Sequence, residues 1–124
     1  MDNPLRLRLR KCQRLCSRKA QEELFSPGHG SLRAHPLHAI FRRTDDAQVR
    51  ILVSVPKRHF KHATDRNRIK RQLREAYRQQ QHLLTAGGLH IAFLWADSQH
   101  LPTAEIFARM KRILQQINDK RADV

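Results

Sequence analysis

The sequence predicts a single small α+β domain, an α/β sandwich-like unit with the element order helix, three strands, helix, strand, helix. Three observations predict it. Apolar residues recur at helical spacing within residues 64–84 and again after Pro102. Residues 49–55 have apolar side chains at every odd position, and residues 89–95 form an almost continuous apolar run, so both segments are predicted strands. A chain of 124 residues with 40% hydrophobic content suits one modest core, and residues 1–124 are therefore predicted to be one domain.

The first half of the chain supplies a short helix and the first strands. Residues 1–16 are basic and lack a clean period, which predicts an irregular or partly mobile arm. Ser17 is a suitable N-cap for a helix that runs to Phe25 and ends at the Pro- and Gly-containing segment 26–30. Residues 37–41 are a predicted strand, and the turn at 45–47 leads into the next one.

The second half alternates helix and strand. A basic loop follows Pro56 and leads into a helix that continues towards Leu84 and stops at Gly87 and Gly88. The strand 89–95 comes next, and the final helix carries its apolar residues at Ile106, Met110, Ile113 and Ile117. Because a helix joins the strands 49–55 and 89–95, these strands are predicted to be parallel neighbours.

The helix that starts near Thr64 has two contrasting sides. With Ile69 at 0° and roughly 100° per residue, Leu73 falls at ~40°, and Ala76 and Tyr77 lie near it at ~340° and ~80°. The cationic arc, from roughly 100° to 200°, contains Lys70, Arg74, Asn67, Arg78 and Arg71, while Arg68 falls near ~260°. A merely solvated basic face would interleave acids at i,i+4 spacing, but this segment offers only Asp65 and Glu75. The helix is therefore predicted to bind a polyanion.

Composition supports the same prediction. The chain has 25 Lys and Arg against 11 Asp and Glu, a formal net charge of +14. Such a balance favours nucleic acid or an anionic membrane surface as the partner. No apolar run approaches the ~20 residues of a membrane-spanning helix. No apolar signal-peptide core follows the basic start, so a cytoplasmic location is predicted.

No constellation of catalytic or metal-binding side chains is apparent. The chain lacks a His-Glu-x-x-His pattern, a nucleophile elbow and a phosphate-binding glycine loop. Cys12 and Cys16, with His29 and His35, match no compact zinc finger in their spacing, so two reduced cysteines are predicted. No catalytic residue and no protein-bound metal is predicted, and any enzymatic role is expected to belong to a partner.

Three segments, residues 53–58, Ala63 and residues 66–75, resemble the signature of the bacterial ribonuclease P protein component. The first is Val-Ser-Val-Pro-Lys-Arg, and the last contains the Arg66-Asn67-Arg68 motif. The resemblance implies a ribosomal-protein-like fold with a left-handed βαβ crossover around the motif helix. It also implies one protein bound to one catalytic RNA, in a ribonucleoprotein endonuclease that removes the 5′ leader of precursor tRNA. The RNA subunit would carry the chemistry with Mg²⁺, without an organic cofactor.

The resemblance also implies roles for individual residues. The motif positions expected to bind the catalytic RNA are Arg66, Asn67, Arg68, Lys70, Arg71 and Arg74, and the preceding loop extends them with Lys57, Arg58 and Lys61. The leader is expected in a cleft between the first helix and the sheet. Phe25 matches an aromatic position of that helix, with an ordinary core role as its alternative. The sheet residues assigned to the leader are Ile40, Phe41, Arg50 and Ser54.

Some positions depart from the family pattern, and one other function stays open. Gln21 stands at the first aromatic position of the helix, residues 59–62 lack the usual glycine, and Trp95 stands near a position that is often basic. The alternative function is a non-enzymatic RNA-binding protein of the ribosomal type. A DNA-binding or membrane-surface role is disfavoured, because no zipper, helix-turn-helix or broad interfacial aromatic face is apparent.

Overall fold

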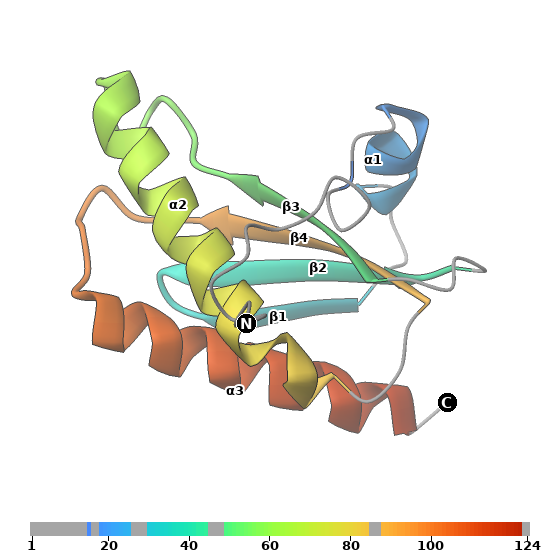
Figure 1. The fold of residues 1–124 in the computed structure, drawn as a ribbon. Helices are drawn as coiled ribbons and strands as arrows, with labels where there is room; N and C mark the ends of the chain where they lie inside the picture. Colours follow the sequence, from blue (N-terminus) through green and yellow to red (C-terminus); the bar gives the residue numbers. More distant parts are fainter. Residues whose placement is uncertain (1–14, 16–17, 26–29, 45–48, 85–87, 123–124) are drawn as a thin grey trace, which may run out of the picture.

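A four-stranded mixed sheet lies at the centre of the structure (Figure 1). The structure, a computed structural model, describes residues 15, 18–25, 30–44, 49–84 and 88–122. In chain order its elements are α1 (Arg18–Leu24), β1 (Gly30–Ala34), β2 (Leu37–Arg43), β3 (Val49–Ser54), α2 (Ala63–Gln80), the 3-10 helix η3 (Gln81–Leu83), β4 (Leu89–Trp95) and α3 (Thr103–Ala122). The predicted α+β class and the predicted element order are confirmed.

The strands are ordered β1-β2-β4-β3 across the sheet. β2 pairs antiparallel with both β1 and β4, whereas β3 pairs parallel with β4, so that Val49 lies opposite Leu89 and Ser54 opposite Leu94. The prediction of parallel neighbours is therefore confirmed. The path from β3 through α2 to β4 is left-handed, as the resemblance implied (Figure 1). Connections of this kind are right-handed in about 98% of cases.

The main core lies between one face of the sheet and the two long helices. The side chains of Ile51, Val53 and Phe93 point from the sheet into this core, and Ile69 and Leu73 of α2 are fully buried there. α3 contributes its whole apolar stripe, which is Ile106, Met110, Ile113, Leu114 and Ile117. Burying an aliphatic side chain of this size contributes roughly 1.5–3 kcal/mol. These contacts hold α2 by one side and leave its other side to solvent.

β1 is the strand whose limits the sequence analysis did not predict. It begins at Gly30, which lies opposite Phe41 of β2. A Cβ atom on Gly30 would lie only 2.3 Å from Cζ of Phe41, so a residue without a side chain is needed for this ring to occupy its place. Gly30 therefore permits Phe41 to fill the main core.

α1 covers one end of the opposite face of the sheet. Leu24 of α1 and Leu15 are buried against Ala92 of β4. The backbone N–H of Leu15 donates to the carbonyl oxygen of Ile51 at 2.7 Å, which attaches this residue to β3. Leu15 belongs to the predicted basic arm, and the other residues of that arm lie outside the described ranges.

The helix limits agree with the predictions to within a few residues. α1 begins at Arg18, the residue after the predicted N-cap Ser17, and ends one residue before the predicted Phe25, while α2 begins at Ala63 instead of Thr64. Ser17 itself lies outside the described residues. Gly88 has a φ of 79°, a left-handed conformation that glycine adopts without strain, where the sequence predicted a stop. No helix in the described part of the chain is long and apolar enough to cross a membrane.

Candidate nucleic-acid interface

The exposed side of α2 carries the predicted cations. Asn67, Arg71 and Arg74 are exposed and Lys70 is half-buried, and we call these four residues the basic face. On the buried side of the helix, Leu73 lies fully within the main core. At 1.5 Å per residue the basic face extends for roughly 10 Å along the helix. The structure thus confirms the division of this helix into an apolar and a cationic side.

Arg68 lies outside the basic face. It is exposed, but it lies about 60° beyond Arg71 around the helix axis. Its side chain can therefore reach a different part of a bound partner from Lys70 or Asn67.

Arg66, the first residue of the motif, is engaged with the backbone of the preceding loop. Its Nη1 donates to the carbonyl oxygen of Phe60 at 2.8 Å and to that of Lys61 at 3.1 Å. The residue is half-buried. Arg66 therefore holds the loop against the first turn of α2, a role that the sequence did not indicate.

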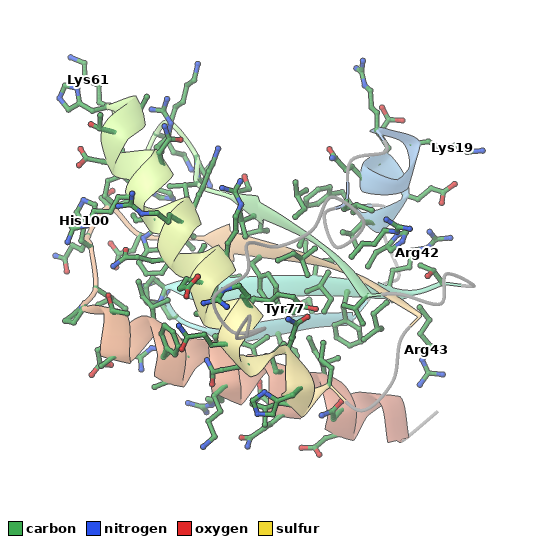
Figure 2. The ribbon with its side chains drawn as sticks, in the orientation of Figure 1. Lys19, Arg42, Arg43, Lys61, Tyr77 and His100 are labelled. Atoms are coloured by element: carbon green, nitrogen blue, oxygen red, sulfur yellow. The ribbon has the colours of Figure 1, made fainter. Side chains whose placement is uncertain are left out.

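The loop before α2 presents the remaining predicted cations. Lys57, Arg58 and Lys61 are all exposed. The loop is fixed through Phe60, whose buried ring lies 4.9 Å from that of His100 in the segment after β4. Lys61 and His100 lie at the end of the molecule where α2 begins (Figure 2). The structure thus brings the loop cations to the same end of the helix as Asn67 and Lys70.

A second contact fixes the same loop. His59 Nδ1 lies 3.3 Å from Ser98 Oγ. His100 Nε2 also lies 3.5 Å from the Asp65 carboxylate of α2. His59, in the stretch that stands in place of the family's glycine-containing segment, therefore connects this loop to the segment after β4, and His100 connects that segment to α2.

Arg78, which the helical wheel placed in the cationic arc, belongs to a local ion pair instead. Its side chain is only 9% exposed, and its Nε donates to Glu75 Oε2 at 2.9 Å while its Nη2 donates to Oε1. Gln79 Nε2 also donates to Glu75 at 2.8 Å. The hydrogen bond from Arg78 holds the pKa of Glu75 below its ordinary value and raises the pKa of Arg78. The prediction that Arg78 adds a charge to the cationic arc is wrong, because its charge is neutralised here.

The described residues cover the sheet face opposite α2 and α3 only in part, and we call it the open face. The strand registers place its residues in three rows across the sheet. Each row contains residues whose side chains share this face, because directly opposite residues point to the same side. The rows are Arg33, His38, Leu94 and Ser54; Ser31, Ile40, Ala92 and Leu52; and Arg42, His90 and Arg50.

Three of the four sheet residues assigned to the leader lie on the open face. Ile40, Arg50 and Ser54 are half-buried there, one in each row. Phe41 is only 8% exposed and belongs to the main core on the other face. The assignment of Phe41 to the leader surface is therefore wrong, because adjacent residues of a strand point to opposite faces.

α1 forms one end of the open face. Phe25, immediately after α1, is 47% exposed, so its alternative role as a core residue is wrong. Gln21, at the position where the family has an aromatic residue, donates from Nε2 to the carbonyl oxygen of Leu15 at 2.7 Å. Arg42 Nη1 donates to Glu23 at 2.8 Å and fastens α1 to β2; Figure 2 shows Arg42 below α1. No sequence spacing indicates this pair, since its members are 19 residues apart.

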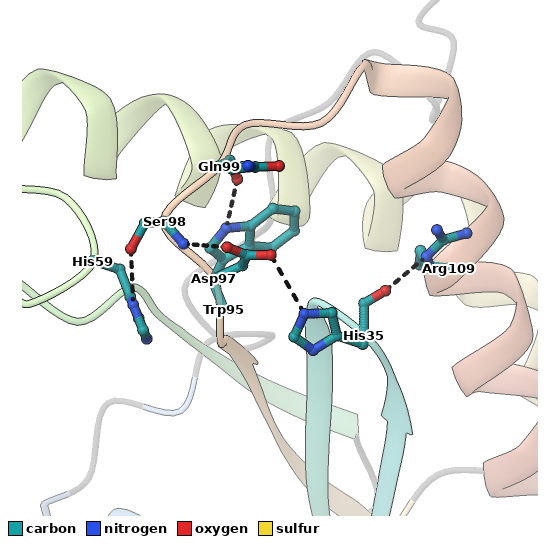
Figure 3. Close-up of polar contacts among 7 residues, drawn as sticks. All are labelled: His35, His59, Trp95, Asp97, Ser98, Gln99 and Arg109. Atoms are coloured by element: carbon teal, nitrogen blue, oxygen red, sulfur yellow. Dashed lines mark hydrogen bonds and ion pairs between the residues drawn. The ribbon is translucent and has the colours of Figure 1, made fainter.

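The turn between β1 and β2 carries a polar cluster that the sequence analysis missed. His35 Nε2 lies 3.3 Å from Asp97 Oδ2, and the carbonyl oxygen of His35 accepts a hydrogen bond from Arg109 Nε at 3.0 Å (Figure 3). The second carboxylate oxygen of Asp97 accepts the backbone N–H of Ser98 at 2.6 Å. Residues from the turn, from the segment after β4 and from α3 therefore hold His35 in place.

His38 and Arg33 lie beside this cluster on the open face. The rings of His35 and His38 are 6.0 Å apart, and Arg33 lies directly opposite His38. Burial lowers the pKa of His38, and the charges of Arg33 and His35 lower it further. Three basic residues within 33–38 are visible in the sequence, but their convergence appears only once the strands are paired.

Other residues considered for a site have structural roles. Trp95 is buried, and its Nε1 donates to the carbonyl oxygen of Gln99 at 3.2 Å, so it offers no ring to the open face (Figure 3). Of the residues weighed for zinc, His35 pairs with Asp97, and Cys12, Cys16 and His29 lie outside the described residues. Within the described ranges, no three His, Cys, Asp or Glu side chains are grouped to hold a metal ion.

Comparisons with known proteins agree on one family. The family model described as Ribonuclease P matches residues 9–118. The ribonuclease P protein component of Porphyromonas gingivalis is 38% identical over 87 residues, which cover 68% of this chain and 63% of that protein. The chain therefore spans less than two thirds of the length of this relative. The corresponding protein of Chlorobaculum tepidum is 35% identical over 122 residues and covers 84% of this chain.

Two solved structures share the fold. The RNase P protein from Thermotoga maritima superimposes with a TM-score of 0.70 at 21% identity, covering 90% of this chain and 97% of that one. The RNase P protein of Staphylococcus aureus has a TM-score of 0.74 at 19% identity, covering 86% and 96%.

Proposed function

The chain belongs to the ribonuclease P protein family, and from this premise we propose that it is the protein subunit of ribonuclease P. The holoenzyme would remove the 5′ leader of precursor tRNA by endonucleolytic cleavage, with the chemistry carried by the RNA subunit. The observation that carries the proposal is the basic face of α2 within the family's motif segment. A separate open face of the sheet supports it by offering a second RNA a place to bind.

The basic face and the loop before α2 would bind the catalytic RNA. Arginine suits this role because its planar guanidinium donates to two phosphate oxygens at once. Asn67 can donate and accept, which allows it to contact a base or a ribose hydroxyl. Each phosphate neutralised by Arg or Lys releases counterions, so this contact would weaken steeply as the salt concentration rises.

The open face would bind the single-stranded leader. Phe25 offers an exposed ring at the α1 end, and Ile40, Arg50 and Ser54 provide apolar and polar contacts along the strands. A base stacked on an aromatic side chain contributes roughly 1–3 kcal/mol. Because Gln21 holds the Leu15 carbonyl where the family has an aromatic residue, leader binding would depend strongly on Phe25.

The RNA subunit would hold the Mg²⁺ that activates the attacking water and stabilises the leaving oxygen. The described residues group no set of ligands for such an ion, so the protein's part would be to bind and position the two RNAs. We further propose a cytoplasmic complex of one protein with one catalytic RNA, because the described residues of each chain present one basic face on α2.

Reconstitution tests this proposal. The purified chain is combined with a bacterial ribonuclease P RNA and a precursor tRNA, and 5′ cleavage is followed over a range of Mg²⁺ concentrations. We expect no cleavage by the chain alone and a lower Mg²⁺ requirement for the RNA when the chain is present. Arg71→Ala should weaken this stimulation, whereas Lys111→Ala, which removes an exposed charge on α3, should preserve it. Tight RNA binding without stimulation would favour a non-enzymatic protein of the ribosomal type.

A further inference from the structure

Three basic side chains lie at the end of the open face that is remote from α1. Arg33 is the last residue of β1 whose side chain lies on the open face, and His38 is the first such residue of β2. His35 lies in the turn between these two strands. Figure 1 shows this turn at the opposite end of the sheet from α1. None of the three belongs to the family motif or to the residues assigned to the leader.

The pairing of β1 with β2 brings like charges together. Arg33 and His38 are directly opposite each other on adjacent strands, an arrangement that is destabilising for two positive charges. Arg33 is exposed, and within the described part of the chain it has no ion pair. The ring of His35 lies 6.0 Å from that of His38. An anion seated among these groups would offset this repulsion when His38 is protonated.

We propose that Arg33, His35 and His38 form a binding site for a backbone phosphate of the single-stranded RNA that crosses the open face. The inference rests on the proposed function and extends it to residues outside the predicted leader set. The Arg33 guanidinium can donate two parallel hydrogen bonds to one phosphate, and the two imidazoles supply further N–H donors. Ser54, in the same row as His38, adds a hydroxyl towards the other edge of the sheet.

Protection of a sheet edge is the plain alternative for Arg33. β1 is an edge strand, and charged side chains on such strands prevent pairing with other molecules. This explanation accounts for Arg33 alone. His38 lies on β2, which is paired on both sides, so edge protection gives no reason for a second basic group opposite Arg33.

The charged surroundings of His38 predict how the site depends on pH. Arg33 faces His38 from β1, and His35 faces it from the turn. Asp97, after β4, pairs with His35. Arg109 of α3 donates a hydrogen bond to the carbonyl oxygen of His35. In the free protein, burial and the two basic neighbours keep the pKa of His38 low. A bound phosphate favours the protonated ring, so binding takes up a proton and becomes tighter as the pH falls.

The holoenzyme provides the first test. Arg33→Gln is compared with Lys111→Gln, which removes the same charge from the exposed side of α3. Binding of a precursor tRNA with a long leader is measured against one with a very short leader, over a range of salt concentrations. For the long leader, Arg33→Gln should lower the slope of log K against log salt by about 0.7, the value for one phosphate contact of a single strand. Equal slopes for the two variants would overturn the proposal and leave edge protection.

His38 itself provides the second test. The pKa of its imidazole is followed by NMR in the free chain, with a single-stranded RNA oligonucleotide, and with inorganic phosphate at the same phosphate concentration. We expect RNA alone to raise this pKa, and His38→Gln to weaken RNA binding at low pH more than at high pH. An unchanged pKa, or an equal rise with inorganic phosphate, which would indicate an adventitious ion only, overturns the site.

The two proposals fail separately. Normal stimulation of cleavage together with equal behaviour of Arg33→Gln and Lys111→Gln would remove the site and leave the proposed function. Absence of stimulation, together with a His38 that responds to single-stranded RNA, would remove the proposed function and leave an RNA-binding site.

Discussion

Arg66 should matter more to the stability of the loop before α2 than to the number of phosphates contacted. Its Nη1 bonds to the carbonyl oxygens of Phe60 and Lys61, and Arg66→Ala removes both hydrogen bonds. Arg71 is the matched comparison, because it is the same residue type on the same helix and is exposed. The two alanine variants lose the same charge but different contacts.

The structure sets the size of the expected effect. A hydrogen bond from a charged donor contributes roughly 1.5–3 kcal/mol when buried. The bond to Phe60 is partly buried and the bond to Lys61 is exposed, so solvent reduces both contributions. We therefore expect Arg66→Ala to lower the free energy of unfolding by about 1–2 kcal/mol. Arg71→Ala should change it by less than about 0.5 kcal/mol, as is usual for surface substitutions.

Urea unfolding and salt-dependent RNA binding together test this division of roles. With an m-value of about 2 kcal/mol/M, Arg66→Ala should lower the urea midpoint by roughly 0.5–1 M. For binding to ribonuclease P RNA, the slope of log K against log salt should fall by about 0.9 in Arg71→Ala if the contacted RNA is double-stranded and resembles B-DNA in charge density. The slope of Arg66→Ala should stay closer to that of the wild type. A stable Arg66→Ala variant with the same loss of slope as Arg71→Ala would show that Arg66 contacts the RNA and does not support the loop.

Two further predictions concern α1 and the Glu75–Arg78 pair. Phe25→Leu should weaken binding of precursor tRNA by roughly 1–3 kcal/mol for one stacked base and leave mature tRNA binding unchanged; equal loss for both RNAs would show that the ring does not contact the leader. Glu75 has a pKa below its ordinary value of 4.5 in the folded chain, so its contribution is present above that pH and is lost as the pH falls through the folded-state pKa. The unfolding free energy of Glu75→Gln should therefore fall less on acidification than that of the wild type or of Asp119→Asn, an exposed control, and parallel curves would contradict the pairing.

Most helices and strands of the fold could be predicted, because each shows its pattern within one short segment of the sequence. Alternation in residues 49–55 and the helical stripes of α2 and α3 each identify an element through the side that it buries. The limits of β1 were not predicted, because its first residue is Gly30 and glycine in a sequence usually indicates a loop. Only the structure shows that the ring of Phe41 occupies the space where a side chain at position 30 would lie. The same pairing placed Phe41 in the core, which residue type alone does not decide.

The site was predictable only where one helix carries it. A helical wheel places Lys70 and Arg74 on the cationic side of α2 and Leu73 on its apolar side, because all three residues lie on one regular helix. The wheel does not predict the hydrogen bonds of Arg66, because they depend on the conformation of the preceding loop. It also does not predict that Glu75 neutralises the charge of Arg78. The cluster of Arg33, His35 and His38 depends on strand pairing, which is a property of the fold and not of any one segment.

The left-handed connection decides which face of the sheet the helix α2 covers and which face stays open. β3 and β4 are parallel neighbours, so the helix that joins them must cross one face, and the hand of the crossing selects the face. A right-handed path would place α2 over Ile40, Leu52 and Leu94 and would cover the open face. The observed path places α2 beside α3, where its apolar side completes the main core. The uncommon handedness therefore leaves the chain with two separate surfaces, the basic face of α2 and the open face of the sheet, and the proposed function assigns one RNA to each.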